Sequence, residues 1–366
     1  MKVISIFGTR PEAIKMAPVV KELESRKDIE SVVCVTAQHR DMLDQVLEVF
    51  KIKPDYDLNI MKPNQTLSHI TAEVIRGIED VIIKEKPDVV LVHGDTTTAM
   101  AASLAAFYQQ VKIGHVEAGL RTRNKYSPYP EEINRQIIDK MADFLFAPTA
   151  KSKANIESEA LNEGQKIYIT GNTAIDALKT TVTEEYSDEN LEWAKDSRLI
   201  LVTAHRRENL GEPMRNIFTA IKKLVEDHKD VKVIYPVHLN PKVQSLAKEV
   251  LGDNDRVRLI NPLDVLDFHN YMHAAYLIMS DSGGIQEEAP ALGKPVLVLR
   301  DTTERPEGIE ANTLKLVGTN TDTIYDEANK LLESEEEYKK MSEAKNPYGD
   351  GTSSKQIVDI LEKEIN

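Results

Sequence analysis

The sequence predicts an α/β protein made of two doubly wound domains that face each other across a cleft. Short β-branched runs alternate with longer amphipathic stretches along the 366 residues, which is the pattern of βαβ units with parallel strands. A polar, acidic segment over residues 180–197 has no strand pattern and separates two sets of strands. The chain also has the length of two ordinary domains, because single hydrophobic cores stop growing at about 250–300 residues.

The alternation gives each expected element its place in the chain. In the first half, strands are expected at residues 2–7, 32–37, 88–93, 112–116 and 143–147. In the second half, strands are expected at residues 198–203, 231–236, 256–260, 275–280, 295–299 and 314–317. Helical stretches are expected at residues 14–23, 67–85, 133–141, 214–225 and 324–332, with a last helix at residues 353–364.

Two of these strands are expected at the centres of their sheets. The runs at 88–93 and 275–280 are nearly all apolar, which is typical of strands covered on both faces. The turn-forming sequence Gly171-Asn172-Thr173 precedes the acidic segment, so we place the domain junction there. The two domains would then cover residues 1–170 and 171–352.

Composition and charge exclude several kinds of partner. Hydrophobic residues make up 41% and charged residues 29% of the chain, a balance typical of soluble globular proteins. The net charge is 46 − 60 = −14, which argues against nucleic acid and anionic membranes as partners. The apolar runs are too short to cross a bilayer or to form a signal peptide, and the single cysteine, Cys34, lies in an apolar run. We therefore expect a cytoplasmic protein with one buried structural thiol.

Ligands of doubly wound folds bind outside the carboxyl ends of the strands, so the residues that follow each strand are the candidates for a site. The first expected strand is followed by GTRPEAIK. Gly8 permits a tight turn, and the start of the next helix offers backbone N–H groups to an anion. Arg10 and Lys15 would add positive charge there, although Arg10 instead pairing with Glu12 or Glu131 is the structural alternative.

A glycine pair follows the expected strand at 275–280, in the string DSGGIQEE. Ser282, Gly283 and Gly284 would let the backbone approach a diphosphate closely at the start of a helix. Glu288 lies one helical turn after Gly284 on the same face and is placed to accept from ribose hydroxyls. The alternative is a helix cap followed by a solvated glutamate.

Three carboxylates lie at positions where ligands of the first half are expected to bind. Two of them follow strands, and the third begins a helix. Asp95 and Glu117 each lie next to a glycine at a strand end, and Glu131 begins a helix after a proline-rich loop. Like charges held close together raise one another's pKa and suit proton transfer. The alternative for each residue is an acid favoured by the positive end of a helix dipole, and it is strongest for Glu131.

The strand expected at 198–203 is followed by AHRREN, which places three basic side chains in a row. His205 in this string is suited to act as an acid or as a donor to phosphate. Taken alone, the string is better explained as a basic surface loop.

A metal site is not expected. His269 and His273 lie four residues apart on an expected helix, but neither a third ligand nor an HExxH pattern accompanies them.

Eight strings, taken in chain order, resemble the non-hydrolysing UDP-N-acetylglucosamine 2-epimerases of bacteria. They are GTRPEAIK, VHGDTTTAMA, GHVEAGLRT, PYPEEINRQ, VTAHRRENLG, DSGGIQEEAP, GKPVLVLRDTTERPEG and NPYGDG. The resemblance extends from residue 8 to residue 351 and so covers essentially the whole chain. It implies two Rossmann-like domains in the arrangement of B-type glycosyltransferases, with a final helix at 353–366 packed back on the first domain.

The resemblance also implies a reaction. Members of this family interconvert UDP-GlcNAc and UDP-ManNAc through anti elimination of UDP to 2-acetamidoglucal, followed by re-addition, and so supply ManNAc for cell-surface glycans. No cofactor is implied, and a homodimer is expected. A glycosyltransferase and a hydrolysing epimerase are the alternatives, because both act on UDP-sugars with a similar fold.

Site residues carried over from the family fall into three groups. The acid/base group is Asp95, Glu117 and Glu131, with His205 assisting near the glycosidic phosphate. The substrate-binding group is Arg10, Lys15, Phe268, Ser282, Gly283, Gly284, Glu288 and Arg305. A regulatory UDP-GlcNAc site is expected at Gln38, Glu132, Arg206 and His238.

Overall fold

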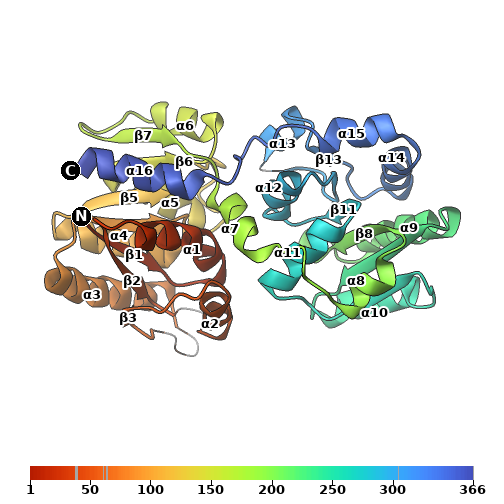
Figure 1. Ribbon diagram of the computed structural model, residues 1–366, viewed down its shortest axis with the longest axis horizontal. Coiled ribbons are helices and arrows are strands. Elements are labelled where there is room, and N and C mark those ends of the chain that lie inside the picture. The colour runs from red at the N-terminus through yellow and green to blue at the C-terminus, as the bar shows by residue number, and fades with distance from the viewer. Residues whose placement is uncertain (38–39, 61, 63–64, 304, 366) are drawn as a thin grey trace. The chain divides into compact units, whose positions relative to one another are not determined.

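The chain folds into two compact units in the computed structural model, which describes residues 1–37, 40–60, 62, 65–303 and 305–365 (Figure 1). One unit comprises Met1–Thr180 together with Tyr348–Asn366, and the other comprises Thr181–Pro347. Each unit contains one parallel sheet with helices on both of its faces. The predicted α/β fold class, with two doubly wound domains, is confirmed.

The first unit is built on a seven-stranded sheet in the order β3-β2-β1-β4-β5-β6-β7, in which every pairing is parallel. Its strands are β1 (Lys2–Phe7), β2 (Glu30–Val35), β3 (Tyr56–Asp57), β4 (Val89–His93), β5 (Lys112–Val116), β6 (Phe144–Ala147) and β7 (Lys166–Ile169). Its helices are α1 (Arg10–Ser25), α2 (Arg40–Val49), α3 (Leu67–Glu85), α4 (Thr97–Tyr108), α5 (Glu131–Met141), α6 (Ala150–Glu157), α7 (Thr173–Thr181) and α16 (Ser353–Ile365).

The second unit repeats this plan with six parallel strands in the order β10-β9-β8-β11-β12-β13. Its strands are β8 (Arg198–Thr203), β9 (Val231–Pro236), β10 (Val257–Ile260), β11 (Leu277–Ser280), β12 (Val296–Val298) and β13 (Leu314–Leu316). Its α-helices are α8 (Glu189–Ala194), α9 (Glu212–Asp227), α10 (Pro241–Leu251), α11 (Val265–Ala274), α12 (Ile285–Glu288), α13 (Pro306–Glu310), α14 (Thr321–Glu333) and α15 (Glu335–Ser342). The short 3-10 turns η1 (Arg207–Asn209) and η2 (Ala289–Leu292) complete it.

Two strands that the sequence did not predict, β3 and β7, lie at the two edges of the first sheet. Strand β3 has only two residues, and β7 (KIYI) is exposed or half-buried at every position. Edge strands bury one side at most, so they lack the apolar run that marks a central strand. By contrast, every residue of β4 and β11 is buried, which confirms the two predicted central strands.

The strand order reverses at one place in each sheet, and that place defines where ligands bind. The reversal lies between β1 and β4 in the first sheet and between β8 and β11 in the second. Helices on opposite faces diverge at such a point and leave a crevice outside the carboxyl ends of the strands. The residues after these four strands are the predicted site segments around Gly8, Asp95, His205 and Ser282.

Hydrophobic packing holds each helix layer to its sheet. Helix α9 buries Met214, Ile217, Phe218, Ile221 and Leu224 completely, and this spacing of three and four residues marks one face of a helix. Each such side chain contributes roughly 1.5–3 kcal/mol to folding when it leaves water. Cys34 is also fully buried, as predicted, and burial raises the pKa of its thiol to about 12.

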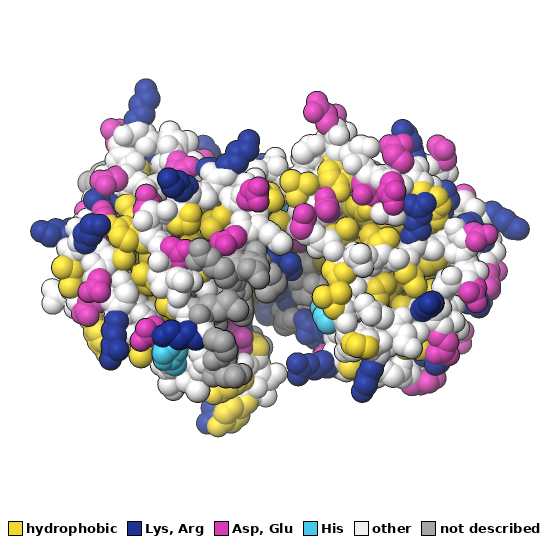
Figure 2. Space-filling model, turned by 90° about the horizontal axis from the view of Figure 1, so that it is seen from below, with side chains coloured by type: hydrophobic (Ala, Val, Ile, Leu, Met, Phe, Trp, Pro, Cys, Tyr) yellow, Lys and Arg dark blue, Asp and Glu magenta, His cyan; other side chains and the backbone are white. Residues whose placement is uncertain are grey.

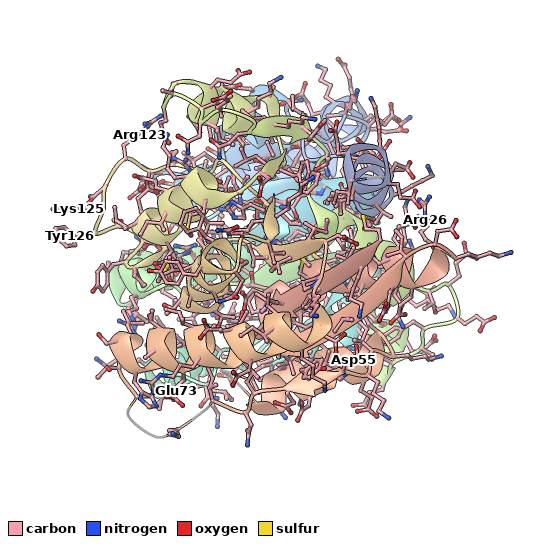
Figure 3. All side chains as sticks on the ribbon, turned by 90° about the vertical axis from the view of Figure 1, so that its left-hand side faces the viewer. Arg26, Asp55, Glu73, Arg123, Lys125 and Tyr126 are labelled. Carbon is pink, nitrogen blue, oxygen red and sulfur yellow. The ribbon has the colours of Figure 1, made fainter. Side chains whose placement is uncertain are left out.

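The chain returns to the first unit at Tyr348, and local hydrogen bonds fix that return. The backbone N–H of Asn172 donates to the Tyr348 carbonyl (2.7 Å), and the Ser354 N–H donates to Asp176 (2.7 Å). Helix α16 then packs against α1, where Arg26 bridges to Asp359 (2.7 Å) (Figure 3). Because α7 is tied to this segment, the units divide at residues 180 and 348, whereas the sequence suggested division at 170 and 352.

Acidic and basic side chains are interspersed over the surface drawn in Figure 2, in keeping with a net charge of −14. Within the described residues, no helix combines the length and the apolar character needed to span a bilayer.

Candidate active site

The turn after β1 is closed around its own glutamate. Glu12, which is buried, accepts hydrogen bonds from the backbone N–H groups of Gly8 (3.0 Å) and Thr9 (2.8 Å). The hydroxyls of Thr9 (2.8 Å) and Thr96 (2.6 Å) also donate to it. Burial raises the pKa of Glu12, and these hydrogen bonds act against that rise. Two of the backbone N–H donors at this turn, those of Gly8 and Thr9, are thus used by Glu12 within the turn itself.

Gly8 is required by a close approach of two strand ends. A Cβ atom at this position would lie 2.0 Å from the Thr36 hydroxyl oxygen and 2.9 Å from that of Thr98. These two hydroxyls are 3.2 Å apart and hydrogen-bond to each other. Any larger residue would force the hydroxyls apart, so the glycine serves packing at the switch point rather than access for phosphate.

Lys15, on the next turn of α1, reaches the predicted carboxylate Glu117 and forms an ion pair with it. The amide Nδ2 of Asn172 donates to the same oxygen, Oε2 (3.0 Å), and the buried Nε2 of His93 lies 3.7 Å away. Burial lowers the pKa of His93 to about 3, so this imidazole is neutral near pH 7. Arg10, by contrast, is exposed.

The titration of Asp95 is suited to proton transfer. Burial raises the pKa of Asp95 to about 6, and the negative charges of Glu117 and Glu131 add to the rise. Arg135 lies 3.2 Å from the Asp95 carboxylate and opposes the rise without cancelling it. The electrostatic effects on Asp95 thus place all three predicted carboxylates at one end of the first sheet.

A buried polar chain supports the loop that carries Asp95. His115 on β5 is within hydrogen-bond distance of the Gly94 carbonyl through Nε2 (2.7 Å) and of Asp139 through Nδ1 (2.6 Å). Arg121 in turn bridges to Asp139 (2.7 Å). Sequence reasoning missed this chain, because its members lie on separate elements and no local spacing links them.

In the second unit, a buried aspartate organises the AHRREN loop. Asp281 accepts from the backbone N–H groups of His205 (2.8 Å) and Arg206 (2.9 Å) and from the Asn209 amide (3.1 Å). Its other oxygen lies 3.2 Å from Nδ1 of His205. Burial alone raises the pKa of Asp281, but the neighbouring His205 ring and the two backbone N–H groups hold it below its ordinary value.

This contact orients the predicted catalytic histidine. With Nδ1 against Asp281, the other ring nitrogen of His205 points away from the carboxylate, and the side chain is 41% exposed. Its ring also stacks on that of His238, with centroids 5.7 Å apart. Asp281 was part of the predicted DSGG string, and its place directly after a strand was a signal that sequence reasoning left unused.

The guanidinium group of Arg305 lies close to Gly283, the first glycine of the pair after β11. A Cβ atom on Gly283 would lie 2.7 Å from the Arg305 guanidinium, whose Nε donates to buried Glu287 (2.7 Å). Glu288 lies near Gly284, since its Oε1 would be 3.8 Å from a Cβ there. This turn thus brings together five of the predicted substrate-binding residues, namely Ser282, Gly283, Gly284, Glu288 and Arg305. The helix that starts after this glycine pair, α12, ends at Glu288, and the turn η2 follows it directly.

The remaining predicted positions have different surroundings. Phe268 is half-buried on α11, and His238 is exposed with Nδ1 accepting from the Asn240 N–H (3.1 Å). Glu132 is fully buried and binds the backbone N–H groups of Thr122 and Arg123 (each 3.0 Å), so its carboxylate holds a loop to α5. Burial raises its pKa, but the hydrogen bonds outweigh that effect.

Arg206 donates through Nε to the carbonyl of Asp281 (2.9 Å), which keeps it at the AHRREN loop. Gln38 lies outside the described residues.

Metal chemistry has no scaffold in the part of the chain that the structure describes, because no three His, Cys, Asp or Glu side chains gather closely enough there to hold an ion. His269 and His273 do lie on one helix, α11. However, His269 is buried and hydrogen-bonded to the Thr181 hydroxyl (2.7 Å).

The two switch points have complementary chemistry. One gathers carboxylates with a lysine, and the other gathers a histidine, an arginine and a glycine turn at a strand end. Carboxylates handle protons, and cations with a glycine turn suit phosphate groups. These features define an α/β enzyme of the class that acts on nucleotide-linked substrates.

Comparison with known proteins identifies the family within that class. The family profile described as UDP-N-acetylglucosamine 2-epimerase matches residues 21–362. The UDP-N-acetylglucosamine 2-epimerase of Bacillus subtilis is 60% identical, covering 99% of this chain and 95% of the relative, and that of Escherichia coli K12 is 51% identical, covering 99% and 98%. The crystal structure of the Neisseria meningitidis enzyme bound to UDP-GlcNAc is 52% identical with a TM-score of 0.88, covering 100% of both chains. The chain belongs to the UDP-N-acetylglucosamine 2-epimerase family, which confirms the resemblance.

Proposed function

We propose that this protein interconverts UDP-GlcNAc and UDP-ManNAc by inverting C2 of the sugar. The observation that carries the proposal is the carboxylate group at the ends of β4 and β5, in which burial raises the pKa of Asp95 to about 6. A general base works best when its pKa lies near the working pH. Relatives that share 51–60% of this sequence are named UDP-N-acetylglucosamine 2-epimerase, which supports the same substrate pair here.

The reaction begins with an elimination. The C2–H bond breaks and its proton passes to a carboxylate, while the electron pair forms a C1–C2 double bond. The C1–O bond to the β-phosphate breaks at the same time, and UDP leaves with that bonding pair. Re-addition reverses these steps, with the proton delivered to the opposite face of C2. Since the C2 proton is not next to a carbonyl group, its removal requires the simultaneous departure of UDP.

Each predicted acid/base residue receives a role from its surroundings. Asp95 exchanges the proton because its pKa is raised toward neutrality. Glu117, paired with Lys15, and Glu131 flank the sugar and complete the group of acids. His205, turned outward by Asp281, stabilises the charge that develops on the departing phosphate oxygen.

Uridine diphosphate is assigned to the second unit. Ser282, Gly283 and Gly284 receive the diphosphate with Arg305 beside them, and Glu288 accepts from the ribose. Phe268 lies against the uracil. Arg10 and Lys15 are the substrate-binding side chains proposed in the first unit. Two structures support nucleotide binding in relatives, since the Neisseria meningitidis enzyme is bound to UDP-GlcNAc and the Methanocaldococcus jannaschii enzyme is in complex with UDP-GlcNAc and UDP.

Isotope incorporation tests the function. Incubation with UDP-GlcNAc in D2O is expected to give UDP-ManNAc carrying deuterium at C2, because the removed proton exchanges with solvent before re-addition. Mass spectrometry of the nucleotide-sugar pool measures the label. Free ManNAc with UDP would instead indicate a hydrolysing epimerase. An absence of label, with transfer only when an acceptor sugar is added, would indicate a glycosyltransferase.

A regulatory UDP-GlcNAc site is part of the proposal, at Gln38, Glu132, Arg206 and His238. Its best support is the AHRREN loop. Arg206 follows His205 in this loop, and the ring of His238 stacks on the ring of His205. Ligand binding there would therefore act directly on the orientation of the catalytic histidine. Glu132 contributes indirectly, because its carboxylate is already engaged by the loop before α5.

We also propose a cytoplasmic homodimer. The neighbouring helices α4 and α5 expose Phe107 (56%) and Tyr108 (62%), with Ile133 and Ile137 at four-residue spacing on α5. Exposed aromatic and aliphatic groups of this kind mark an interaction surface. A cytoplasmic location suits both a nucleotide-sugar substrate and a single buried thiol.

Sedimentation measures the assembly. The wild-type protein is expected to have the mass of a dimer, twice the 41.2 kDa of one chain. The double variant Phe107→Glu/Tyr108→Glu is expected to have the mass of one chain. Two buried charges facing two others at an isologous interface would disfavour the dimer strongly. Leu239→Glu in the second unit, at an equally exposed position, is the control and should remain dimeric. A dimeric double variant would place the interface elsewhere.

A further inference from the structure

Asn172 uses every one of its hydrogen-bonding groups inside the first unit. Its backbone N–H donates to the Tyr348 carbonyl (2.7 Å), and its backbone carbonyl accepts from the Ile175 N–H (3.1 Å). Its side-chain Oδ1 accepts from the Ala174 N–H (2.9 Å), and its Nδ2 donates to Oε2 of Glu117 (3.0 Å). The residue is only 2% exposed, so water does not compete for these contacts.

The orientation of this amide is fixed by its own helix. Because the Ala174 N–H can be satisfied only by an acceptor, Oδ1 must lie on that side, and the N–H group must face Glu117. Glu117 is itself held in an uncommon conformation, with φ of +68°. Non-glycine residues with such a φ cost free energy and persist where the surrounding structure enforces them, often at functional sites.

Three elements converge on the same carboxylate oxygen of Glu117. Lys15 comes from α1, His93 from the end of β4, and Asn172 from the segment that joins β7 to α7. Oε1, the other oxygen, lies toward Gly94, 3.7 Å from where a Cβ atom of that glycine would be. The Glu117 carboxylate is thus anchored through Oε2, and its second oxygen lies beside the loop that carries Asp95.

We propose that Asn172 is a positioning residue for the catalytic carboxylate Glu117, and that the returning segment at Tyr348 holds Asn172 in place. The proposal rests on the proposed function, in which Glu117 is one of the acid/base groups. Gly171 makes this junction possible, since a Cβ atom there would lie 2.9 Å from the Tyr348 carbonyl oxygen and 2.8 Å from the Ser353 hydroxyl. The C-terminal part of the chain thereby contributes to the order of the acid/base group without contacting the substrate.

Two substitutions separate positioning from folding. Serine and aspartate both cap helices well, so Asn172→Ser and Asn172→Asp each preserve the acceptor for the Ala174 N–H. Serine is too short to reach Glu117, and aspartate places a second carboxylate against it. We expect kcat to fall roughly 10- to 100-fold for Asn172→Ser and further for Asn172→Asp, because small misplacements of a reacting group are costly. The affinity for UDP should stay within about 2-fold of wild type, since the UDP site is assigned to the other unit.

The readouts distinguish this proposal from its alternatives. If Asn172 only capped α7, both variants would share the wild-type kcat, and that result would overturn the proposal. A decrease in melting temperature in proportion to the decrease in kcat, in both variants, would also overturn the proposal. Asn320→Ser, at the cap of α14, is the matched control and should keep full kcat. The wild-type protein in the same D2O assay tests the proposed function separately, because its failure to label C2 would appear before any variant is compared.

Discussion

Replacing Asp95 by asparagine is expected to slow epimerisation about 10²- to 10⁴-fold while leaving UDP binding intact. The variant keeps the shape of the side chain but cannot accept the C2 proton, and general acid–base catalysis contributes about 10²- to 10⁴-fold to rates. Steady-state turnover of UDP-GlcNAc would show a fall of that size in kcat, and calorimetric titration with UDP would show little change. Asp88→Asn, at the opposite end of β4, removes an exposed carboxylate that binds the Lys2 N–H (2.7 Å) and should keep full turnover.

The pH dependence of the wild-type enzyme should report the same group. Because burial raises the pKa of Asp95 to about 6, the base form is lost as the pH falls through 6, and kcat should fall with it. An unshifted aspartate would keep its base form down to about pH 4. A kcat profile that stays flat between pH 7 and pH 5 would contradict the assignment of Asp95 as the proton-exchanging group.

The raised pKa of Asp95 also affects stability: ionisation of Asp95, which favours turnover, disfavours folding. A carboxylate whose pKa is raised on folding costs stability when it is ionised, so this cost is absent below about pH 4 and complete above pH 6. A rise of the pKa from 3.8 to about 6 corresponds to about 3 kcal/mol at most, and the 27% exposure of the side chain reduces that cost. Asp95→Asn should therefore gain stability relative to wild type as the pH rises from 4 to 7, measured by denaturant unfolding at each pH. A difference that does not change with pH would count against a raised pKa.

Removing Asp281 is expected to cost both stability and turnover. Asp281→Ala leaves the N–H groups of His205 and Arg206 and the Asn209 amide without their acceptor. An unpaired buried donor costs about 1–3 kcal/mol, so the second unit should lose roughly 2–5 kcal/mol. Its melting temperature would fall by roughly 5–15 °C. Turnover should fall as well, because His205 loses the carboxylate that orients it.

Asp281→Asn tests the effect of the carboxylate on His205 while keeping the acceptor that holds the AHRREN loop. The amide oxygen can replace the acceptor of the backbone N–H groups, so most of the stability should remain, whereas the negative charge beside His205 is gone. We expect kcat to fall by about 10-fold or more with a melting temperature close to wild type. Asp264→Asn, at the cap of α11, is the control and should change neither quantity. Wild-type kcat in Asp281→Asn would show that this carboxylate does not assist His205.

The sequence was sufficient for the strands and helices whose signals are local. An apolar run identified β4 and β11 because each is buried on both faces, and spacing of three and four residues identified α9. The edge strands β3 and β7 escaped prediction because exposure removes that signal. Since ligands of doubly wound folds bind beyond strand ends, the strand pattern also selected Asp95, Glu117, His205 and Ser282 for inspection.

The role of the first turn could not be read in the same way. Gly8 and the helix start suggested an anion site, yet the donors are used by Glu12 and the glycine is required by Thr36 and Thr98. The spacing of Thr9 and Glu12 was a readable sign of a self-capped helix start. The hydroxyls that crowd Gly8 come from elements far along the chain, and no local pattern announces them.

The sequence by itself determined the two-domain α/β fold, the strand ends and the family, because these depend on local periodicity and on ordered strings of residues. Only the tertiary structure decided which side chains meet. Lys15 and Glu117 are 102 residues apart, Asn172 and Glu117 are 55 apart, and His205 and Asp281 are 76 apart. Such pairs form when parallel strands bring distant segments to one edge of a sheet. Their burial and mutual charges then set the pKa of groups such as Asp95, and these are properties of the packed molecule rather than of any one segment.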